Sequence, residues 1–266
     1  MIRATLTLFA LALLSFTSPE ANPVTPALAA SSNIAANLTF EQKQLAFDQH
    51  IEQVYAEADL EQKGLSFPVF KKAYVGLQNF KDRQLVDPSR SILTIVDFTK
   101  PSSQKRMWIV DVNARKLLLN TLVAHGRNTG NVTAKTFSNE PNSYMSSLGF
   151  YLTSKTYYGK HGLSLRLKGM DEGFNSNAMQ RAIVIHGADY ATENFMKQYG
   201  RLGRSLGCPA VPTEVSKTVI ETIKDETVLY VHSNDKTYTS DFLNQTQAIE
   251  SYAATLPAFD MNTIEA

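Results

Sequence analysis

The spacing of apolar residues changes at Asp87-Pro88-Ser89, and this change most constrains the fold. Upstream, apolar residues recur three or four positions apart, which is the spacing of an amphipathic helix. Downstream, short runs rich in β-branched and aromatic residues alternate with clusters of Gly, Pro, Asn and Ser. This order predicts a mainly β domain over residues 88–235, preceded by an α-helical N-terminal segment over residues 31–87.

Two helices are expected in the N-terminal segment. Thr39-Phe40-Glu41-Gln42 has the form of a capping box, which marks the start of the first helix. The second helix is expected to begin at Ser66, with Pro68 in its first turn. The expected buried stripes are Phe47, Ile51, Val54, Tyr55 and Ala58 in the first helix, and Phe70, Ala73, Tyr74, Leu77 and Phe80 in the second.

The remaining elements are predicted from short apolar runs and turn signals. One further helix is expected over residues 213–224. Residues 236–266 are expected to form a C-terminal tail, loosely docked over 241–266, because their periodicity is weak. Strands are expected over residues 91–98, 107–112, 117–124, 149–153, 181–185 and 227–232.

Residues 1–30 resemble a secretory signal peptide. Arg3 supplies a positive charge, residues 6–16 are apolar, and Ala27-Leu28-Ala29 offers a small-residue cleavage site. The apolar stretch is shorter than the ~20 residues needed to span a bilayer. We therefore expect a cleaved signal peptide and a mature chain without a transmembrane segment. An uncleaved membrane anchor is the alternative.

Charge and cysteine content exclude several classes of protein. The 266 residues include 26 Lys and Arg against 25 Asp and Glu, so no strong positive field favours nucleic acid. The one cysteine, Cys208, cannot form an internal disulfide or a zinc site of several thiolates. The histidines also lack metal-ligand spacing, so neither a metal nor a cofactor is expected.

The residues that suggest chemistry lie between positions 181 and 212. An apolar run delivers His186-Gly187 at the predicted C-terminal end of a strand, and Cys208 follows in a Gly-rich loop. An imidazole can take the proton of a thiol and so activate it as a nucleophile. Because Pro209 has no N–H, the oxyanion donors are expected to be the backbone N–H groups of Gly207 and Cys208. A buried, inert cysteine and a structural histidine remain open on these residues alone.

The segment resembles the murein L,D-transpeptidase catalytic domain, a family of cysteine transpeptidases. The matching motifs are His186-Gly187 and Ser205-Leu206-Gly207-Cys208, and the likeness extends over roughly residues 90–235. It implies an L,D-transpeptidase-like β-sandwich that acts on peptidoglycan stem peptides in the periplasm. Cys208 would form a thioester and yield 3→3 cross-links, His186 would be the base, and the Gly187 carbonyl would orient the imidazole.

Two departures from the family motif affect the prediction. Leu206 stands where the commonest motif has His, and Ala210 stands where it has Arg. We expect Arg204 to replace the missing Arg as a carboxylate clamp. The other expected substrate-binding residues are Ser205, Tyr157 and His161.

Several alternatives stay open. With water as the acceptor the enzyme would be an L,D-carboxypeptidase that trims tetrapeptide stems. A non-catalytic wall-binding module is the alternative from another class of protein. A sortase-like enzyme is disfavoured because the Thr-x-Thr-Cys motif of sortases is absent from this sequence. A papain-like enzyme is disfavoured because that family places Cys before His, whereas His186 precedes Cys208 here. The oligomeric state is not predicted.

Overall fold

The computed structural model describes residues 38–256, so the predicted signal peptide over residues 1–30 lies outside the described residues. The core is one eight-stranded mixed sheet in the order β3-β2-β1-β8-β4-β5-β6-β7. The pairs β1–β8 and β6–β7 are parallel, and the other neighbours are antiparallel. The strands are β1 (Ile92–Asp97), β2 (Met107–Asp111), β3 (Lys116–Thr121), β4 (Gly149–Gly159), β5 (Gly162–Gly169), β6 (Val184–Ala188), β7 (Ala210–Pro212) and β8 (Val228–His232).

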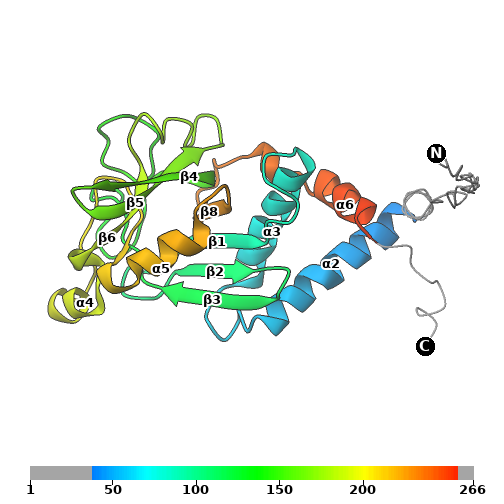
Figure 1. Ribbon diagram of the computed structural model, residues 1–266, viewed down its shortest axis with the longest axis horizontal. Helices are drawn as coiled ribbons and strands as arrows, with labels where there is room; N and C mark the ends of the chain where they lie inside the picture. The colour runs from blue at the N-terminus through cyan, green and yellow to red at the C-terminus, as the bar shows by residue number, and fades with distance from the viewer. Residues whose placement is uncertain (1–37, 257–266) are drawn as a thin grey trace, which may run out of the picture.

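Helices cover both faces of the sheet. Figure 1 shows α2 and α6 together at the end of the molecule away from β6, and α4 beside β6. The helices are α2 (Phe40–Glu57), α3 (Phe67–Asp82), α4 (Glu193–Tyr199), α5 (Thr213–Ile223) and α6 (Gln245–Ala254), with short 3₁₀ turns at Asp189–Ala191 and Asp241–Leu243. Among residues 38–256, no helix combines the length and apolar composition needed to cross a bilayer. The expected mainly β fold with a helical N-terminal segment is confirmed.

The period of two along a strand divides the core into two apolar clusters. In β8, Val228 and Tyr230 pack with α2, α3 and α6, whereas Leu229 and Val231 pack with α5 on the opposite face. Because the central strands are buried on both sides, they are apolar almost throughout. The N-terminal helices therefore share a core with the sheet.

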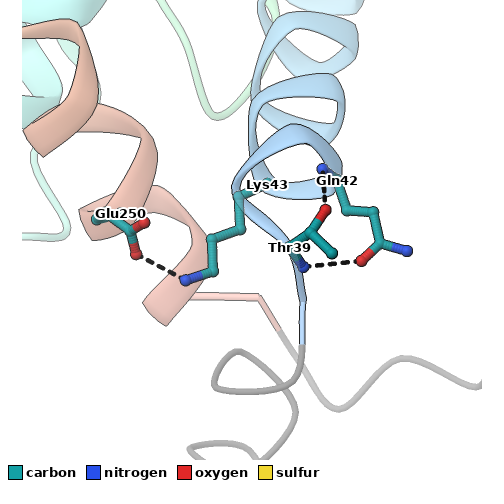
Figure 2. A network of polar contacts seen from close by, with 4 residues as sticks. All are labelled: Thr39, Gln42, Lys43 and Glu250. Carbon is teal, nitrogen blue, oxygen red and sulfur yellow. Dashed lines mark hydrogen bonds and ion pairs between the residues drawn. The ribbon is translucent and has the colours of Figure 1, made fainter.

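Local signals fix both N-terminal helices. The Thr39 hydroxyl accepts a hydrogen bond from the Gln42 N–H at 3.3 Å, and the Gln42 side chain accepts from the Thr39 N–H at 2.9 Å (Figure 2). This is the predicted capping box. Ser66 precedes α3, and Pro68 lies in its first turn, as predicted. Gly76 of α3 packs against Phe150, and a Cβ there would lie 2.0 Å from the ring, so only glycine allows this approach to the sheet.

The prediction of a loosely docked tail is wrong for residues 241–254. Phe242 is buried against Phe80, with ring centroids 4.0 Å apart. Ala248 and Ile249 of α6 are buried in the cluster formed with α2 and α3. Lys43 of α2 also forms an ion pair with Glu250 at 2.7 Å (Figure 2). The weak periodicity misled the prediction because α6 contributes few large apolar residues.

Three further differences concern the strands. The sequence analysis did not predict β5 or β7, and it ended β4 at residue 153, although β4 continues to residue 159. It also began β6 too early. Ala182 has φ 53°, a left-handed conformation that interrupts an extended chain, so β6 begins at Val184. His186 therefore lies within β6 and not at its end.

Candidate active site

The candidate site is built on one row of residues across neighbouring strands. Tyr157 of β4 is opposite Ser164 of β5, and Ser164 is opposite His186 of β6. Residues directly opposite one another point to the same face of a sheet. The row continues to Ala210 of β7, two residues after Cys208. The topology thus brings Tyr157, His186 and the cysteine loop to one edge of the sheet.

The His186 ring is held in a defined tautomer. Its Nδ1 lies 2.9 Å from the Gly187 carbonyl oxygen, and a carbonyl can only accept. Nδ1 therefore carries the proton, which leaves Nε2 of the neutral ring able to accept one. Burial lowers the pKa of His186, the Gly187 carbonyl opposes the shift, and nearby His161 and Lys160 lower the pKa further.

His161 lies directly against this imidazole. The two rings are stacked with their centroids 4.3 Å apart and an interplanar angle of 24°. His161 is exposed and lies in the turn between β4 and β5. The stack places this turn beside the candidate base and restricts the motion of its ring. Tyr157 lies on the same hairpin, with the guanidinium of Arg166 4.6 Å from its ring centroid.

Cys208 is partly buried beside the start of β6. Its Sγ accepts a hydrogen bond from the Val184 N–H at 3.4 Å and lies 3.8 Å from the Ala182 carbonyl. In the described part of the chain, no hydrogen bond joins Sγ to His186. Val184 precedes His186 by two residues, which is ~6.6 Å along a strand. The structure thus brings the thiol to the strand that carries the imidazole, without direct contact.

The surroundings of Cys208 favour the protonated thiol. Burial raises the pKa of Cys208, while the Val184 N–H and the positive charge of Arg181 oppose the shift. The pKa of the thiol is raised and the pKa of the imidazole is lowered, so both groups are neutral at rest. The arrangement suits proton transfer during nucleophilic attack and does not maintain a permanent thiolate–imidazolium pair.

The cysteine loop is held from inside by Ser205. Its hydroxyl donates to the Cys208 carbonyl at 2.6 Å and accepts from the Gly207 N–H at 3.0 Å. Ser205 is buried, so its hydroxyl supports the loop in this structure. The sequence analysis instead predicted that Ser205 binds the substrate. The Gly207 N–H is also engaged, which differs from its expected role in the oxyanion hole. Gly207 has φ 123°, and a Cβ would lie 2.8 Å from the Met145 carbonyl, so this loop requires glycine.

Two arginines lie near the cysteine loop: Arg204, for which the sequence analysis predicted a role as a carboxylate clamp, and Arg181, for which it made no prediction. Arg204 is exposed, and its Nη1 donates to the carbonyls of Arg127 and Gly130, both at 3.3 Å. Two cations, Arg181 and to a smaller extent Lys160, lower the pKa of the thiol, and sequence reasoning selected neither. The Arg181 guanidinium donates to the carbonyls of Ser138 and Met145 and so ties their loop to the segment that precedes β6. Nothing in the sequence near position 181 indicated this role, because the loop it holds lies some forty positions away.

Beneath the cysteine loop lies a buried pair of basic residues. Arg106 is fully buried, and its Nη2 lies 2.8 Å from Nδ1 of His125. The His125 carbonyl accepts from the Ser205 N–H at 3.0 Å, so this pair supports the loop from below. The Nε2 of His125 is buried without a hydrogen-bond partner; the Gly130 carbonyl lies nearby, but the geometry does not form a hydrogen bond.

The fold is a mainly β domain that brings one thiol and one imidazole to neighbouring positions. The family model of the L,D-transpeptidase catalytic domain matches residues 61–232, well over half of the chain. The chain belongs to the L,D-transpeptidase catalytic-domain family. The match begins upstream of α3, so it includes the second N-terminal helix. The comparison with curated proteins gave no match.

The comparison with solved structures gave several matches. An L,D-transpeptidase from Mycobacterium smegmatis is 8% identical, with 54% of this chain and 59% of that chain covered, at a TM-score of 0.35. The helical cell shape determining protein Pgp2 from Campylobacter jejuni is 13% identical, with 68% and 62% covered, at 0.36. A cysteine-to-serine variant of an Enterococcus faecium L,D-transpeptidase is 14% identical, with 54% and 50% covered, at 0.33. The chain spans about half to three fifths of these proteins, and no residue role is transferred from them.

Proposed function

We propose that this protein is a cysteine L,D-transpeptidase of the cell envelope that acts on peptidoglycan stem peptides through a Cys208 thioester. The observation that carries the proposal is the hydrogen bond from the Val184 N–H to Cys208 Sγ, because it fixes the thiol beside the strand that bears His186. The family supplies the substrate class, peptidoglycan. The periplasm and the 3→3 product are part of the proposal.

The first step is attack of the Cys208 sulfur on the carbonyl of the third stem residue. The thiol proton passes to Nε2 of His186, which the bond from Nδ1 to Gly187 leaves free to accept it. Since Sγ lies toward Val184 at rest, a rotation of the Cys208 side chain accompanies this transfer. The Cys208 N–H makes no hydrogen bond within the described residues and is the proposed oxyanion donor.

The second step completes acyl transfer. The tetrahedral intermediate collapses, the C–N bond to the terminal D-Ala breaks, and the leaving amine takes the proton from His186. The side-chain amine of a second stem then attacks the thioester, His186 takes its proton, and the thiol is restored. His161 is proposed to bind the stem because it stacks on His186, and Tyr157 because it lies in the same cross-strand row. Arg204 remains a proposed clamp from its exposed position.

The competing functions differ in the fate of the thioester. Water in place of the second amine gives a tripeptide and an L,D-carboxypeptidase. A non-catalytic wall-binding module gives no thioester. Leu206, which is exposed beside Cys208, is the motif departure that keeps the binding module as an alternative.

The test is incubation of the purified chain with disaccharide-tetrapeptide, followed by mass-resolved chromatography. We expect release of D-Ala and cross-linked dimers with the wild type, and neither with Cys208→Ser. Leu206→Ala is the matched control, since it alters an exposed neighbour without removing a group assigned to the chemistry. Tripeptides without dimers would favour the carboxypeptidase. Binding to peptidoglycan without turnover, equal in both proteins, would refute the enzymatic proposal.

A further inference from the structure

A cavity of about 650 Å³ lies where β1 and β8 end, against the first turns of α3. Strands β4 and β5 separate β8 from β6, so three inter-strand spacings, ~14 Å, lie between this cavity and the His186 strand. Its volume falls in the range of small-molecule sites. The lining residues are Ser66, Pro68, Val69, Lys72, Thr99, His232, Ser233, Asn234, Asp235 and Lys236.

The cavity carries an excess of positive groups. Lys72 and Lys236 line it, and neither forms an ion pair within residues 38–256. Asp235 is the acidic residue in the lining. Its Oδ1 accepts from the N–H and hydroxyl of Thr237, which ties this oxygen to its own turn. The lining thus holds two ammonium groups and one carboxylate that is already partly satisfied, and the buried carboxylate of Asp97, outside the lining, acts on His232.

His232 gives the cavity a buried donor. It is 7% exposed, and its Nδ1 lies 3.2 Å from the Tyr230 hydroxyl. The Tyr230 hydroxyl can either donate to Nδ1 or accept from it, and when it donates, the proton of the neutral ring lies on Nε2. Nε2 has no hydrogen-bond partner among residues 38–256, and it is not among the fully buried unpaired atoms, so it is accessible from the cavity that His232 lines.

The charges near His232 act in opposite directions. Burial lowers the pKa of His232, Asp97 opposes the shift, and Lys72, which lines the same cavity, lowers the pKa further. Ser66 makes no side-chain capping bond at the start of α3. Ser66, Pro68 and Val69 line the cavity, so the positive end of the α3 dipole borders it.

We propose that this cavity binds a small molecule that carries a phosphate or carboxylate group. The anionic group lies between Lys72, Lys236 and the Nε2–H of His232, which supply two charged donors and one neutral donor. This site is distinct from the Cys208 site and does not depend on the reaction proposed there.

The test is calorimetric titration of the purified chain with inorganic phosphate and, separately, with acetate, at ionic strength matched with sodium chloride. We expect saturable one-site binding of at least one anion. Lys72→Gln should weaken it about tenfold, which is about 1.4 kcal/mol. Lys217→Gln is the matched control, because it removes the same charge from α5 on the opposite face of the sheet.

The pattern of binding decides the outcome. Tighter binding of phosphate identifies a phosphorylated ligand, and tighter binding of acetate identifies a carboxylate ligand. Binding of neither anion, or equal weakening by Lys72→Gln and Lys217→Gln, would overturn the proposal. Cys208→Ser should bind the anion as the wild type does, so this test stands apart from loss of transpeptidase activity.

Discussion

Replacing His125 with Asn is expected to remove one part of the acid sensitivity of the fold. His125 is fully buried, and its Nδ1 faces the guanidinium of Arg106 at 2.8 Å. Burial is the main cause that lowers the pKa of His125 to about 4, and the charge of Arg106 adds to the effect. The folded protein therefore keeps this ring neutral at pH values where a solvated imidazole takes up a proton.

The size of the effect follows from linkage. In the unfolded chain the imidazole titrates near its ordinary pKa of 6.5, so between pH 6.5 and about 4 the unfolded state binds more protons. Stability from this residue is complete above pH 6.5 and is lost as the pH falls through that window. At ~1.36 kcal/mol per pH unit, the difference corresponds to ~3 kcal/mol of unfolding free energy.

The assay is urea unfolding of wild type and His125→Asn at a series of pH values from 7.5 to 4. Asn offers an oxygen to Arg106 but does not titrate, so the variant should lose ~3 kcal/mol less than the wild type over this range. Ile220→Val is the control. It truncates the buried core at a cost of ~1 kcal/mol and should shift the whole curve without changing its slope. Parallel curves for wild type and His125→Asn would refute the reasoning.

Three further predictions concern the cysteine loop. Gly207→Ala forces a side chain toward the Met145 carbonyl at positive φ, so it should cost ~1–3 kcal/mol in chemical unfolding, whereas Gly173→Ala, with open space around it, should cost less. Arg181→Gln removes hydrogen bonds to two loop carbonyls, so it should lower the free energy of unfolding by ~2–3 kcal/mol. The variant also loses a positive charge near the thiol, so the pKa of Cys208 should rise. An unchanged pH profile of Cys208 alkylation would contradict this second expectation. Because burial raises the pKa of the Cys208 thiol, its rate of alkylation by iodoacetamide should still increase as the pH passes 9, and a plateau below pH 8 would count against a protonated resting thiol.

Much of the fold follows from local sequence signals. The capping box at Thr39, Pro68 in the first turn of α3, and the apolar runs of β1, β2 and β8 each specify their own element. Strand β5 was also predictable, because Leu163, Leu165 and Leu167 alternate with polar residues, although the sequence analysis did not use this pattern. Strand β7 is three residues long and exists through its pairing with β6, which no local pattern reveals.

The site divides in the same way. His186 and Cys208 could be selected from the sequence, because an apolar run leads to the histidine and a Gly-rich stretch surrounds the cysteine. Arg181 and the Ser205 hydroxyl could not be assigned, since their roles depend on partners set by the packing of distant loops. The predicted role of Arg204 rested on charge alone, and its side chain bonds to the turn at residues 127–130.

The docking of α6 has a consequence for the order in which the chain can fold. Strand β1 pairs with β8, so Leu93 can form its strand pairing only after Val228 has been synthesised. The buried amide of Asn79 donates to the carbonyl of Phe242, which lies just before α6. Both closures join segments more than 130 positions apart, which is costly before other contacts form. A chain growing from its N-terminus therefore cannot complete the core around α2 and α3 until residues 228–254 have been made. The last elements to be made are thus the ones that commit the chain to the folded state.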